Sequence, residues 1–274
     1  MPERSLAIVI VSYNVRGDLD RCLRSLAAAR RPGPTTITVV DNQSSDGTLA
    51  WLRTAWPDVQ ALDAGGNLGF SRANNLGIRA TTGDFVLLLN PDTDVPPDAL
   101  TTLVDALADD GSAAIAGPRL VDAADRPELS FGPMMSPWAE FTQRRLVRAY
   151  EAAAPWAVAR VTRDTSQPGP RDWVSGACLL ARRADLDAVG LLDERYFMYT
   201  EDVDLCAAVR ARGRRVIFVP AATVRHLRGR SAASAPGPTE QRRRESQVAF
   251  YRKHHPAWAP LLIWWLQRRG VDVR

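Results

Sequence analysis

Three short apolar runs, each followed directly by polar residues, constrain the fold of this chain most strongly. The runs span residues 6–11, 36–40 and 85–89 and consist mainly of Val, Ile and Leu. Continuous runs of this kind are typical of strands in a parallel sheet, because helices bury both faces of such a sheet. Apolar residues at helical spacing lie between the runs, first at 18–30. The alternation predicts βαβ units and an α/β fold, with a Rossmann-like, mostly parallel sheet flanked by helices.

Further elements extend this alternation along the chain. Helices are expected at 48–54, 73–80, 96–108 and 201–212, and strands at 173–180 and 216–219. Prolines interrupt residues 122–170, so this segment is predicted to be irregular, with a helix left open at 140–159. Residues 231–240 are rich in Ser, Ala, Pro and Gly and predict a linker. The chain therefore divides into a body of residues 1–230 and a tail of residues 231–274, which is expected to be helical.

Polar residues at the ends of the three apolar runs mark a candidate site. Ser12 and Asn14 follow the first run, Asp41 ends the second, and residues 90–94 follow the third. The carboxyl ends of parallel strands meet at one edge of a sheet, where open α/β sheets bind their ligands. These side chains are therefore expected to converge on one crevice.

Two acids in this group, Asp92 and Asp94, are spaced to hold a cation. Oxygen ligands suit a hard divalent ion, which can neutralise a diphosphate leaving group. The alternative is a polar turn before the next helix, where Asp98 already fits the capping position. His226 follows the last predicted strand and so returns to the edge that carries Asp92, although a lone histidine is more often structural.

Three further acids, Glu201, Asp202 and Asp204, begin a predicted helix. A helix N-terminus stabilises negative charge, so capping is one interpretation. The other is that the apolar residues 197–199 bury one carboxylate and raise its pKa, as a general base for a hydroxyl requires. The pattern alone favours neither interpretation.

Two weaker signals concern a nucleotide. Asp41 and the polar residues after it offer carboxylate and amide groups to the edge of a base. The glycine-rich turn at 65–69 permits close approach of the backbone, but it matches neither the P-loop nor the dinucleotide fingerprint.

Charge and cysteine content bear on compartment and partners. The three cysteines are far apart, which excludes a disulfide framework and indicates core residues in a reducing compartment. No signal peptide or run of transmembrane length is evident, so a cytoplasmic protein is expected. Residues 225–274 carry eleven Lys and Arg against three Asp and Glu. This basic tail indicates an anionic partner, either lipid headgroups or nucleic acid.

Together, six ordered motifs resemble those of the family 2 inverting glycosyltransferases, which have the A-type nucleotide-sugar fold. The motifs are VIVSYN (9–14), VDNQSSDGT (40–48), NLGFSRANNLG (67–77), LNPD (89–92), SGA (175–177) and MYTEDVDLC (198–206). The LNPD motif and the segment YRKHH (251–255) are similar to those of bacterial rhamnosyltransferases that build surface polysaccharides. The resemblance spans most of the chain.

The resemblance implies roles for individual residues. Asp202 matches the catalytic base, which Glu201 would support. Nucleotide-sugar binding falls to Ser12, Asn14, Asp41, Asn67, Arg72 and Asp92. Metal binding, with Mg²⁺ or Mn²⁺ as cofactor, falls to Asp92, Asp94 and His226, although Asn90 replaces the first acid of the family's Asp-x-Asp signature. The acceptor is expected to meet Trp173, Gly176, Ala177 and Asp204, with residues 122–170 on the acceptor side.

The resemblance also implies partners. The donor would be a dTDP- or UDP-sugar, with L-rhamnose from dTDP-rhamnose the first choice, and the acceptor a glycan or polyprenyl-linked saccharide. Residues 257–269 are predicted to form a helix with Trp258, Leu261, Leu262 and Trp265 on one apolar face. That face suits peripheral contact with the inner side of the plasma membrane, or packing on the body.

A nucleic acid partner is not expected, whereas a homodimer is left open. The rival functions are a sugar-nucleotide nucleotidyltransferase, which lacks support because its glycine-rich start is missing, and a non-catalytic nucleotide-sugar binder, which would need neither Asp92 nor Asp202.

Overall fold

A mixed sheet lies at the centre of the molecule and contains the strands predicted at 6–11, 36–40, 85–89 and 216–219. The computed structural model describes residues 4–227 and 236–273. The strand order is β3-β2-β1-β4-β10-β6-β11-β5, with β8 paired to β11. These strands are β1 (Leu6–Ser12), β2 (Thr35–Asp41), β3 (Gln60–Asp63), β4 (Phe85–Leu89), β5 (Thr93–Asp94), β6 (Ala113–Val121), β8 (Gly169–Arg171), β10 (Cys178–Arg182) and β11 (Arg215–His226).

Strand directions agree with the predicted parallel sheet, with one reversal in its interior. β1 is parallel to both β2 and β4, and β6 is parallel to β11. β10 runs antiparallel between β4 and β6. The strand predicted at 173–180 is two strands, because β9 (Trp173–Val174) leaves the main sheet and pairs with β7 (Phe131–Gly132).

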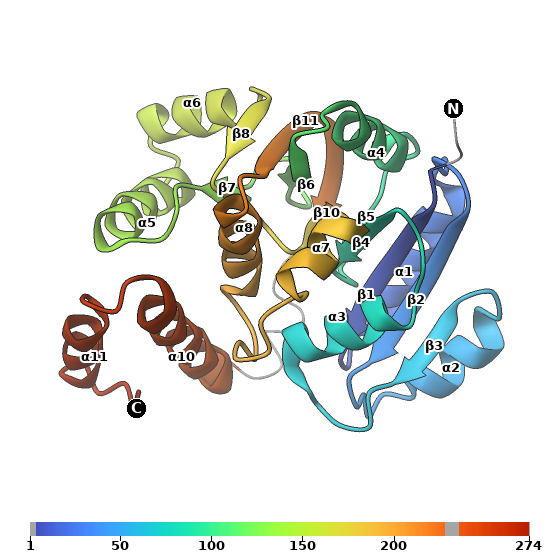
Figure 1. Ribbon diagram of the computed structural model, residues 1–274, viewed down its shortest axis with the longest axis horizontal. Helices are drawn as coiled ribbons and strands as arrows, with labels where there is room; N and C mark the ends of the chain where they lie inside the picture. Colours follow the sequence, from blue (N-terminus) through green and yellow to red (C-terminus); the bar gives the residue numbers. More distant parts are fainter. Residues whose placement is uncertain (1–3, 228–235, 274) are drawn as a thin grey trace.

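Helices cover both faces of this sheet (Figure 1), which is why its central strands β1 and β4 are apolar along almost their whole length. Ile8 and Ile10 of β1 face one hydrophobic cluster, whereas Val9 faces the other. The first cluster includes side chains of α1 (Arg16–Ala28), α2 (Thr48–Ala55) and α4 (Ala99–Asp109). The second includes side chains of α3 (Gly69–Arg79), α7 (Arg183–Val189) and α8 (Glu201–Ala211). All three cysteines are buried in these clusters, as predicted.

Residues 122–170 are not irregular, and this prediction was wrong. The segment contains β7, α5 (Pro137–Glu151), α6 (Pro155–Asp164) and part of β8. Both helices have proline in their first turn, where its fixed φ angle favours a helix and no hydrogen bond is lost. Ser136 caps α5 by accepting a hydrogen bond from the Ala139 N–H at 3.2 Å. The prolines therefore start helices here, and the single helix left open at 140–159 is divided between two.

The tail consists of two helices that pack on the body. They are α10 (Pro236–His254) and α11 (Ala259–Gln267). The predicted linker at 231–240 ends earlier than expected, since the helix begins at Pro236, and residues 228–235 lie outside the described part of the chain. Phe250 and Tyr251 of α10 are buried against Tyr196 and Val203 of the body. Within the described residues, no helix is long and apolar enough to cross a membrane.

Candidate active site

The polar ends of β1, β2 and β4 meet at one edge of the sheet. Ser12 and Asp41 are direct partners in the β1–β2 ladder, so they lie side by side. The Asn90 N–H, just after β4, donates to the Ala177 carbonyl at 2.9 Å. The Gly176 N–H in turn donates to an oxygen of Asp202 at 2.8 Å. The loop at 175–177 therefore joins the strand edge to the acids of α8.

Asp41 and Ser12 form a polar pocket with unused hydrogen-bonding capacity. One oxygen of Asp41 accepts a hydrogen bond from the Ser44 N–H at 3.2 Å. Its other oxygen and the Ser12 hydroxyl are buried and have no hydrogen-bond partner in the described residues. Asn14 shapes the adjacent loop, because its side-chain oxygen accepts from the Ser45 N–H at 2.7 Å. Buried polar atoms without partners are uncommon, which suggests that a ligand satisfies them.

Asn67 and Arg72 lie nearby but already have protein partners. The Asn67 oxygen accepts from the side-chain amide of Asn42 at 3.0 Å, which holds the glycine-rich turn against the end of β2. Arg72 is exposed and forms an ion pair with Glu194, with 3.6 Å between the charged atoms. Any contact between Arg72 and a nucleotide would require that exposed pair to open.

A glycine brings this turn to the loop before α8. Gly69 has φ of +80°, and a Cβ atom there would lie 2.4 Å from the Phe197 carbonyl oxygen. The Phe70 N–H donates to the same oxygen at 2.6 Å. Only glycine permits both this conformation and this approach, so the NLGF motif is needed to seat the acidic helix.

Asp92 and His226 come together as the sequence predicted. Asp92 is buried, and its Oδ1 lies 3.4 Å from His226 Nε2. Asn90 also reaches this ring nitrogen, at 3.4 Å. The other ring nitrogen of His226 lies 3.3 Å from an oxygen of Glu128. Burial alone would lower the pKa of His226, but its bonds to Asp92 and Glu128 outweigh burial and raise the pKa to about 9.

This arrangement fits a divalent cation. Two ligands at right angles around Mg²⁺ are separated by about 3 Å, close to the Asp92–His226 spacing. Glu128 would then hold the second ring nitrogen, as carboxylates often do behind a metal-binding histidine. Within residues 4–227 and 236–273, no group of three or more His, Cys, Asp or Glu has the geometry of a metal site. A cation would therefore need ligands from the substrate as well, as Mg²⁺ commonly does.

Asp94, which the resemblance assigned to the metal, has a protein partner in the structure. Its carboxylate forms an ion pair with Arg225 at 3.3 Å, and Arg225 also binds Asp125 at 2.7 Å. Asp94 and Arg225 are neighbours in the β5–β11 ladder, so the pair fastens these two strands at the edge of the sheet. Asp92 and His226 therefore lie together without Asp94, and the metal-binding role of all three stays a prediction.

Asp202 lies in the first turn of α8, where the backbone is strained. Tyr199 and Thr200 both have positive φ angles, 70° and 73°. Such conformations cost on the order of 1 kcal/mol or more each in non-glycine residues and are common at functional sites. Asp202 is half-buried, and its oxygens accept from the N–H groups of Gly176 and Val203. Burial raises the pKa of Asp202 in spite of these two bonds.

Glu201 precedes Asp202 in the chain and is affected by its charge. It is 6% exposed, and its Oε2 has no hydrogen-bond partner among the described residues. Burial, followed by the adjacent charge of Asp202, raises the pKa of Glu201 well above its ordinary value. The N–H groups that bind Asp202 stabilise its charged form. Glu201 is therefore the acid of the two that more readily holds a proton, and Asp202 the one whose charged form the backbone favours.

Asp204 does not face an acceptor, and the structure corrects this expectation. Its carboxylate is buried and binds Lys253 at 2.8 Å, His254 at 2.6 Å and the Tyr196 hydroxyl at 3.0 Å. Lys253 also binds Asp193 at 2.8 Å. A buried carboxylate needs such partners, and here the YRKHH segment of α10 supplies them. Lys253 and His254 are residues whose role the sequence did not reveal, because they lie about fifty residues away.

The remaining expected acceptor residues differ in exposure. Gly176 lies against Asp202, since a Cβ added to it would be 3.3 Å from the Asp202 Cβ. Ala177 is buried, and its carbonyl accepts from Asn90. Trp173 is half-buried, and its indole N–H donates to the Pro133 carbonyl at 2.9 Å. Gly176 and Ala177 are both buried, so the contact of these residues with an acceptor stays a prediction.

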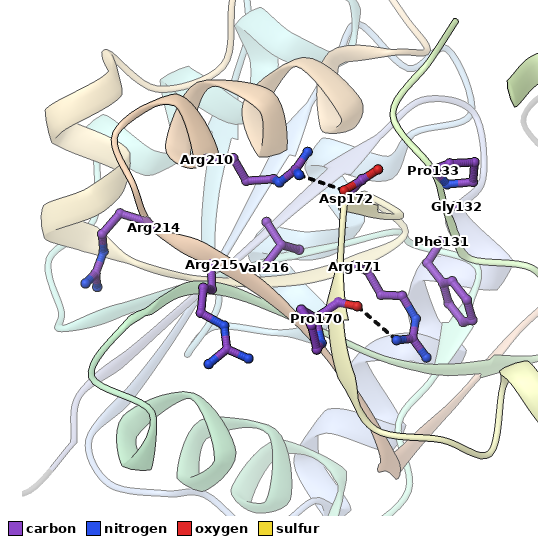
Figure 2. A pocket seen from close by; sticks show the side chains of 10 residues that line it. All are labelled: Phe131, Gly132, Pro133, Pro170, Arg171, Asp172, Arg210, Arg214, Arg215 and Val216. Carbon is purple, nitrogen blue, oxygen red and sulfur yellow. Dashed lines mark hydrogen bonds and ion pairs between the residues drawn. The ribbon is translucent and has the colours of Figure 1, made fainter.

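A separate hollow of about 510 Å³ lies at the far end of α8 and is shown in Figure 2. Its lining residues are Phe131, Gly132, Pro133, Pro170, Arg171, Asp172, Arg210, Arg214, Arg215 and Val216. Arg210 pairs with Asp172 at 2.7 Å, and Arg171 donates to the Pro170 carbonyl at 2.9 Å. Arg210 lies eight positions after Asp202, about 12 Å along a helix. The hollow is therefore distinct from the strand-edge site.

Comparison with known families matches nearly the whole of this framework. The model of the family described as "Glycosyltransferase like family 2" matches residues 2–259. The chain belongs to this family. It is therefore a glycosyltransferase, and the resemblance drawn from its six motifs is confirmed.

Curated relatives within the family include rhamnosyltransferases. The chain is 32% identical to an N-acetylglucosaminyl-diphospho-decaprenol L-rhamnosyltransferase of Mycobacterium tuberculosis, covering 98% of this chain and 91% of the relative. It is 26% identical to a rhamnosyltransferase of Escherichia coli K12, covering 78% of this chain and 80% of the relative. The predicted resemblance to bacterial rhamnosyltransferases is therefore confirmed.

Solved structures establish the fold. A mannosyltransferase of Pyrobaculum calidifontis in complex with GDP-Man and Mn²⁺ superposes with a TM-score of 0.63 at 18% identity, covering 94% of this chain and 67% of that one. GalNAc-T7 with UDP, GalNAc and Mn²⁺ gives a TM-score of 0.62 at 17% identity, covering 82% of this chain and 43% of that one. The glycosyltransferase A-type fold is thus confirmed.

Proposed function

We propose that this glycosyltransferase transfers a sugar from a dTDP- or UDP-sugar to a hydroxyl of a polyprenyl-linked saccharide, with inversion at the anomeric carbon. L-Rhamnose from dTDP-rhamnose is the preferred donor sugar. The name of the Mycobacterium tuberculosis relative, which describes an L-rhamnosyltransferase acting on a decaprenyl diphosphate saccharide, supports both choices.

One chain of contacts carries the proposal. Asp202 is bound by the Gly176 N–H, and the next residue, Ala177, binds Asn90 beside Asp92 and His226. A proton acceptor and a site that favours positive charge therefore lie on either side of one short loop. A displacement at a sugar needs those two functions, one for the attacking hydroxyl and one for the departing diphosphate.

The unpartnered oxygen of Asp41 supports a pyrimidine donor. Uracil and thymine both present a ring N–H, which a buried carboxylate oxygen without another donor can bind. Ser12 adds a hydroxyl that can either donate or accept, next to Asp41 in the sheet. Guanine presents a ring N–H and an adjacent amino group, which together need both oxygens of a carboxylate, whereas one oxygen of Asp41 already accepts from the Ser44 N–H.

Asp92 and His226 would hold the divalent cation, Mg²⁺ or Mn²⁺. When bound, such an ion neutralises the charge that develops on the nucleoside diphosphate. Glu128 keeps the imidazole oriented, and Asn90 borders the same ring nitrogen. The raised pKa of His226 indicates that this position favours positive charge.

Asp202 performs the proton transfer in this proposal. The acceptor hydroxyl oxygen bonds to the anomeric carbon as the bond from that carbon to the diphosphate breaks, and the hydroxyl proton passes to Asp202. Because this is one displacement from the opposite face, the configuration inverts and no covalent enzyme intermediate forms. Glu201 stays protonated throughout, and its neutral form keeps Asp202 ionised.

The acceptor hydroxyl would approach at the loop that carries Gly176, beside Asp202. A lipid-linked acceptor would require the enzyme to work in the cytoplasm at the inner face of the plasma membrane, as a peripheral protein.

A donor panel tests this function. Purified protein is incubated with dTDP-rhamnose, UDP-sugars and GDP-mannose, with Mg²⁺ or with chelator, and a short-chain prenyl diphosphate saccharide as acceptor. We expect release of nucleoside diphosphate with a pyrimidine donor, complete dependence on the cation, and thermal stabilisation by the same donor. Asp92→Ala should lose both the stabilisation and the release.

Other results of the panel would contradict the proposal. Release of pyrophosphate would indicate a nucleotidyltransferase, and donor binding without any release would indicate a binding protein. Stronger stabilisation by GDP-mannose would exclude the pyrimidine assignment, and full activity in chelator would exclude the cation.

A further inference from the structure

Exposed large apolar side chains gather on three helices. In the described part of the chain these side chains are Tyr13, Trp138, Phe141, Trp156, Val158, Trp258, Leu261 and Trp264. Apart from Tyr13, all of them lie on α5, on α6 or at α11. Trp138 is 73% exposed. These three helices lie at one end of the molecule, on the left in Figure 1.

Contacts between the tail and α5 make this region continuous. A ring nitrogen of His255 lies 2.8 Å from the Met135 carbonyl, just before α5. The Tyr251 hydroxyl donates to Glu140 on α5 at 2.7 Å. Met135 also packs in the cluster that contains Ala259, the first residue of α11. Trp138 and Trp258 therefore each lie three residues from a direct contact between the two segments.

The tail helix differs from the single apolar face that was predicted. Leu262 and Trp265 pack against buried clusters of the tail, whereas Trp258 and Leu261 are exposed together with Trp264. The exposed face of α11 thus comprises Trp258, Leu261 and Trp264. Half of the predicted face is used to hold the helix in place.

Unpaired positive charge surrounds these aromatic residues. In the described chain, no ion pair is made by Arg145, Arg148, Arg252, Arg268 or Arg269. Arg268 and Arg269 stack on Trp264 and Trp265, at 4.6 and 4.0 Å from the ring centres. Three other arginines of the basic tail, Arg242, Arg243 and Arg244, are paired with Glu240 and Glu245.

A shallow hollow within this region combines the same two features. It has a volume of about 480 Å³ and is lined by Arg252, Pro256, Ala259, Pro260, Ile263, Trp264 and Gln267. One guanidinium in an otherwise uncharged lining suits a molecule with a phosphate and an apolar portion. This is the chemistry of a phospholipid at the boundary between headgroup and acyl chain.

We propose that α5, α6 and α11 form one docking surface for an anionic lipid bilayer. Exposed tryptophan with neighbouring arginine is the composition of protein surfaces at a membrane interface. A second copy of this chain is a poor occupant, because two positively charged surfaces would face each other. The inference rests on the proposed function in one respect, because a lipid-linked acceptor is the reason for the enzyme to bind a bilayer.

Vesicle binding by substituted proteins tests this surface. The double variants Trp138→Gln/Trp156→Gln and Trp258→Gln/Trp264→Gln are compared for flotation with phosphatidylcholine vesicles, with and without phosphatidylglycerol. We expect the wild-type protein to float with anionic vesicles, and each variant to bind them at least about tenfold more weakly. Melting temperatures and sugar transfer to a water-soluble acceptor should be unchanged, because these side chains are exposed and lie outside the catalytic site.

A matched pair isolates the role of charge. Arg145→Gln/Arg148→Gln should weaken binding to anionic vesicles, whereas Arg31→Gln/Arg53→Gln removes the same charge after α1 and on α2 and should not. Wild-type binding to anionic vesicles by Trp138→Gln/Trp156→Gln would overturn the proposal. It would also be overturned if the wild-type protein were a dimer and these substitutions dissociated the dimer without weakening vesicle binding. Vesicle binding by a protein that releases no nucleoside diphosphate would contradict the proposed function alone.

Discussion

At the scale of single residues, the chemistry depends on which of two adjacent acids holds a proton. Glu201 is more deeply buried than Asp202 and has an oxygen without a hydrogen-bond partner in the described structure. Asp202 receives two backbone N–H groups, which favour its charged form. The difference arises from the path of the backbone around Thr200, not from the identity of the acids.

Replacing each acid by its amide separates the two roles. Asp202→Asn removes the proton acceptor and should lower the transfer rate by about 10²-fold or more, while donor binding persists. Glu201→Gln imitates the protonated acid and should keep the rate within about tenfold of wild type. Rates of nucleoside diphosphate release in the presence of acceptor, together with donor affinity, make this comparison.

The pH dependence provides a control. A general base acts when deprotonated, so transfer should fall as the pH falls through the raised pKa of Asp202. This acidic limb should be absent from the residual rate of Asp202→Asn. A wild-type rate in Asp202→Asn with a large loss in Glu201→Gln would reverse the assignment.

At the scale of elements, α10 holds the catalytic helix in position. Lys253 and His254 bind Asp204 on α8, and the Ser246 hydroxyl donates to the Met198 carbonyl at 2.7 Å in the strained loop before it. Gln247 and Tyr251 bind Glu140 on α5. One tail helix therefore connects α8, which carries Asp202, with α5.

Removal of one partner tests this connection. Lys253→Met leaves the buried Asp204 with His254 and Tyr196 only. The substitution should lower the free energy of unfolding by about 2 kcal/mol, because it leaves a buried charge without its lysine partner. Arg160→Met breaks an exposed pair with Asp164 and should change it by less than about 0.5 kcal/mol. Urea denaturation measures both, and equal effects would mean that the Lys253 pair is not important for stability.

At the scale of the whole molecule, the tail is a structural part of the body. The Tyr196 and Val203 side chains, both buried, are covered by Phe250, Tyr251 and Ala259 of the tail. Helix α11 adds a second small cluster, in which Leu266 and Val273 pack against Val248 of α10. Loss of the tail would expose apolar surface next to the catalytic helix.

Two truncations should therefore behave differently. A chain ending at residue 235 lacks α10 and should aggregate or melt without a cooperative transition, because Asp204 and Tyr196 lose their partners. A chain ending at residue 256 retains α10 and should fold with a lower Tm. Thermal melting and size-exclusion chromatography check this. Cooperative folding of the shorter chain at the wild-type Tm would contradict the structural role of the tail.

The sequence alone determined the parallel half of the sheet, the site edge and the family. Residues 6–11 and 85–89 are apolar without interruption, and residues 36–40 are apolar apart from Thr36 and Thr38. Burial on both sheet faces is the physical cause of that pattern. Because parallel strand ends meet at one edge, the convergence of Ser12 with Asp41 was predictable from strand order. The metal, the donor and most site roles stay predictions.

Tertiary structure decided what depends on contacts between distant segments. Strand β6 was missed because its Ala, Gly and Pro residues weaken the local signal, yet Gly117 is needed where Val174 would lie 2.5 Å from an added Cβ. The prolines of 122–170 indicate interruption or a helix start equally well until the backbone is known. Asp204 resembled its neighbour Asp202 in the sequence, and only the contact with Lys253 of the tail showed that Asp204 belongs to a buried ion pair. Periodicity reports which face of an element is buried, whereas the partner of a buried charge is set by the packing of the whole chain.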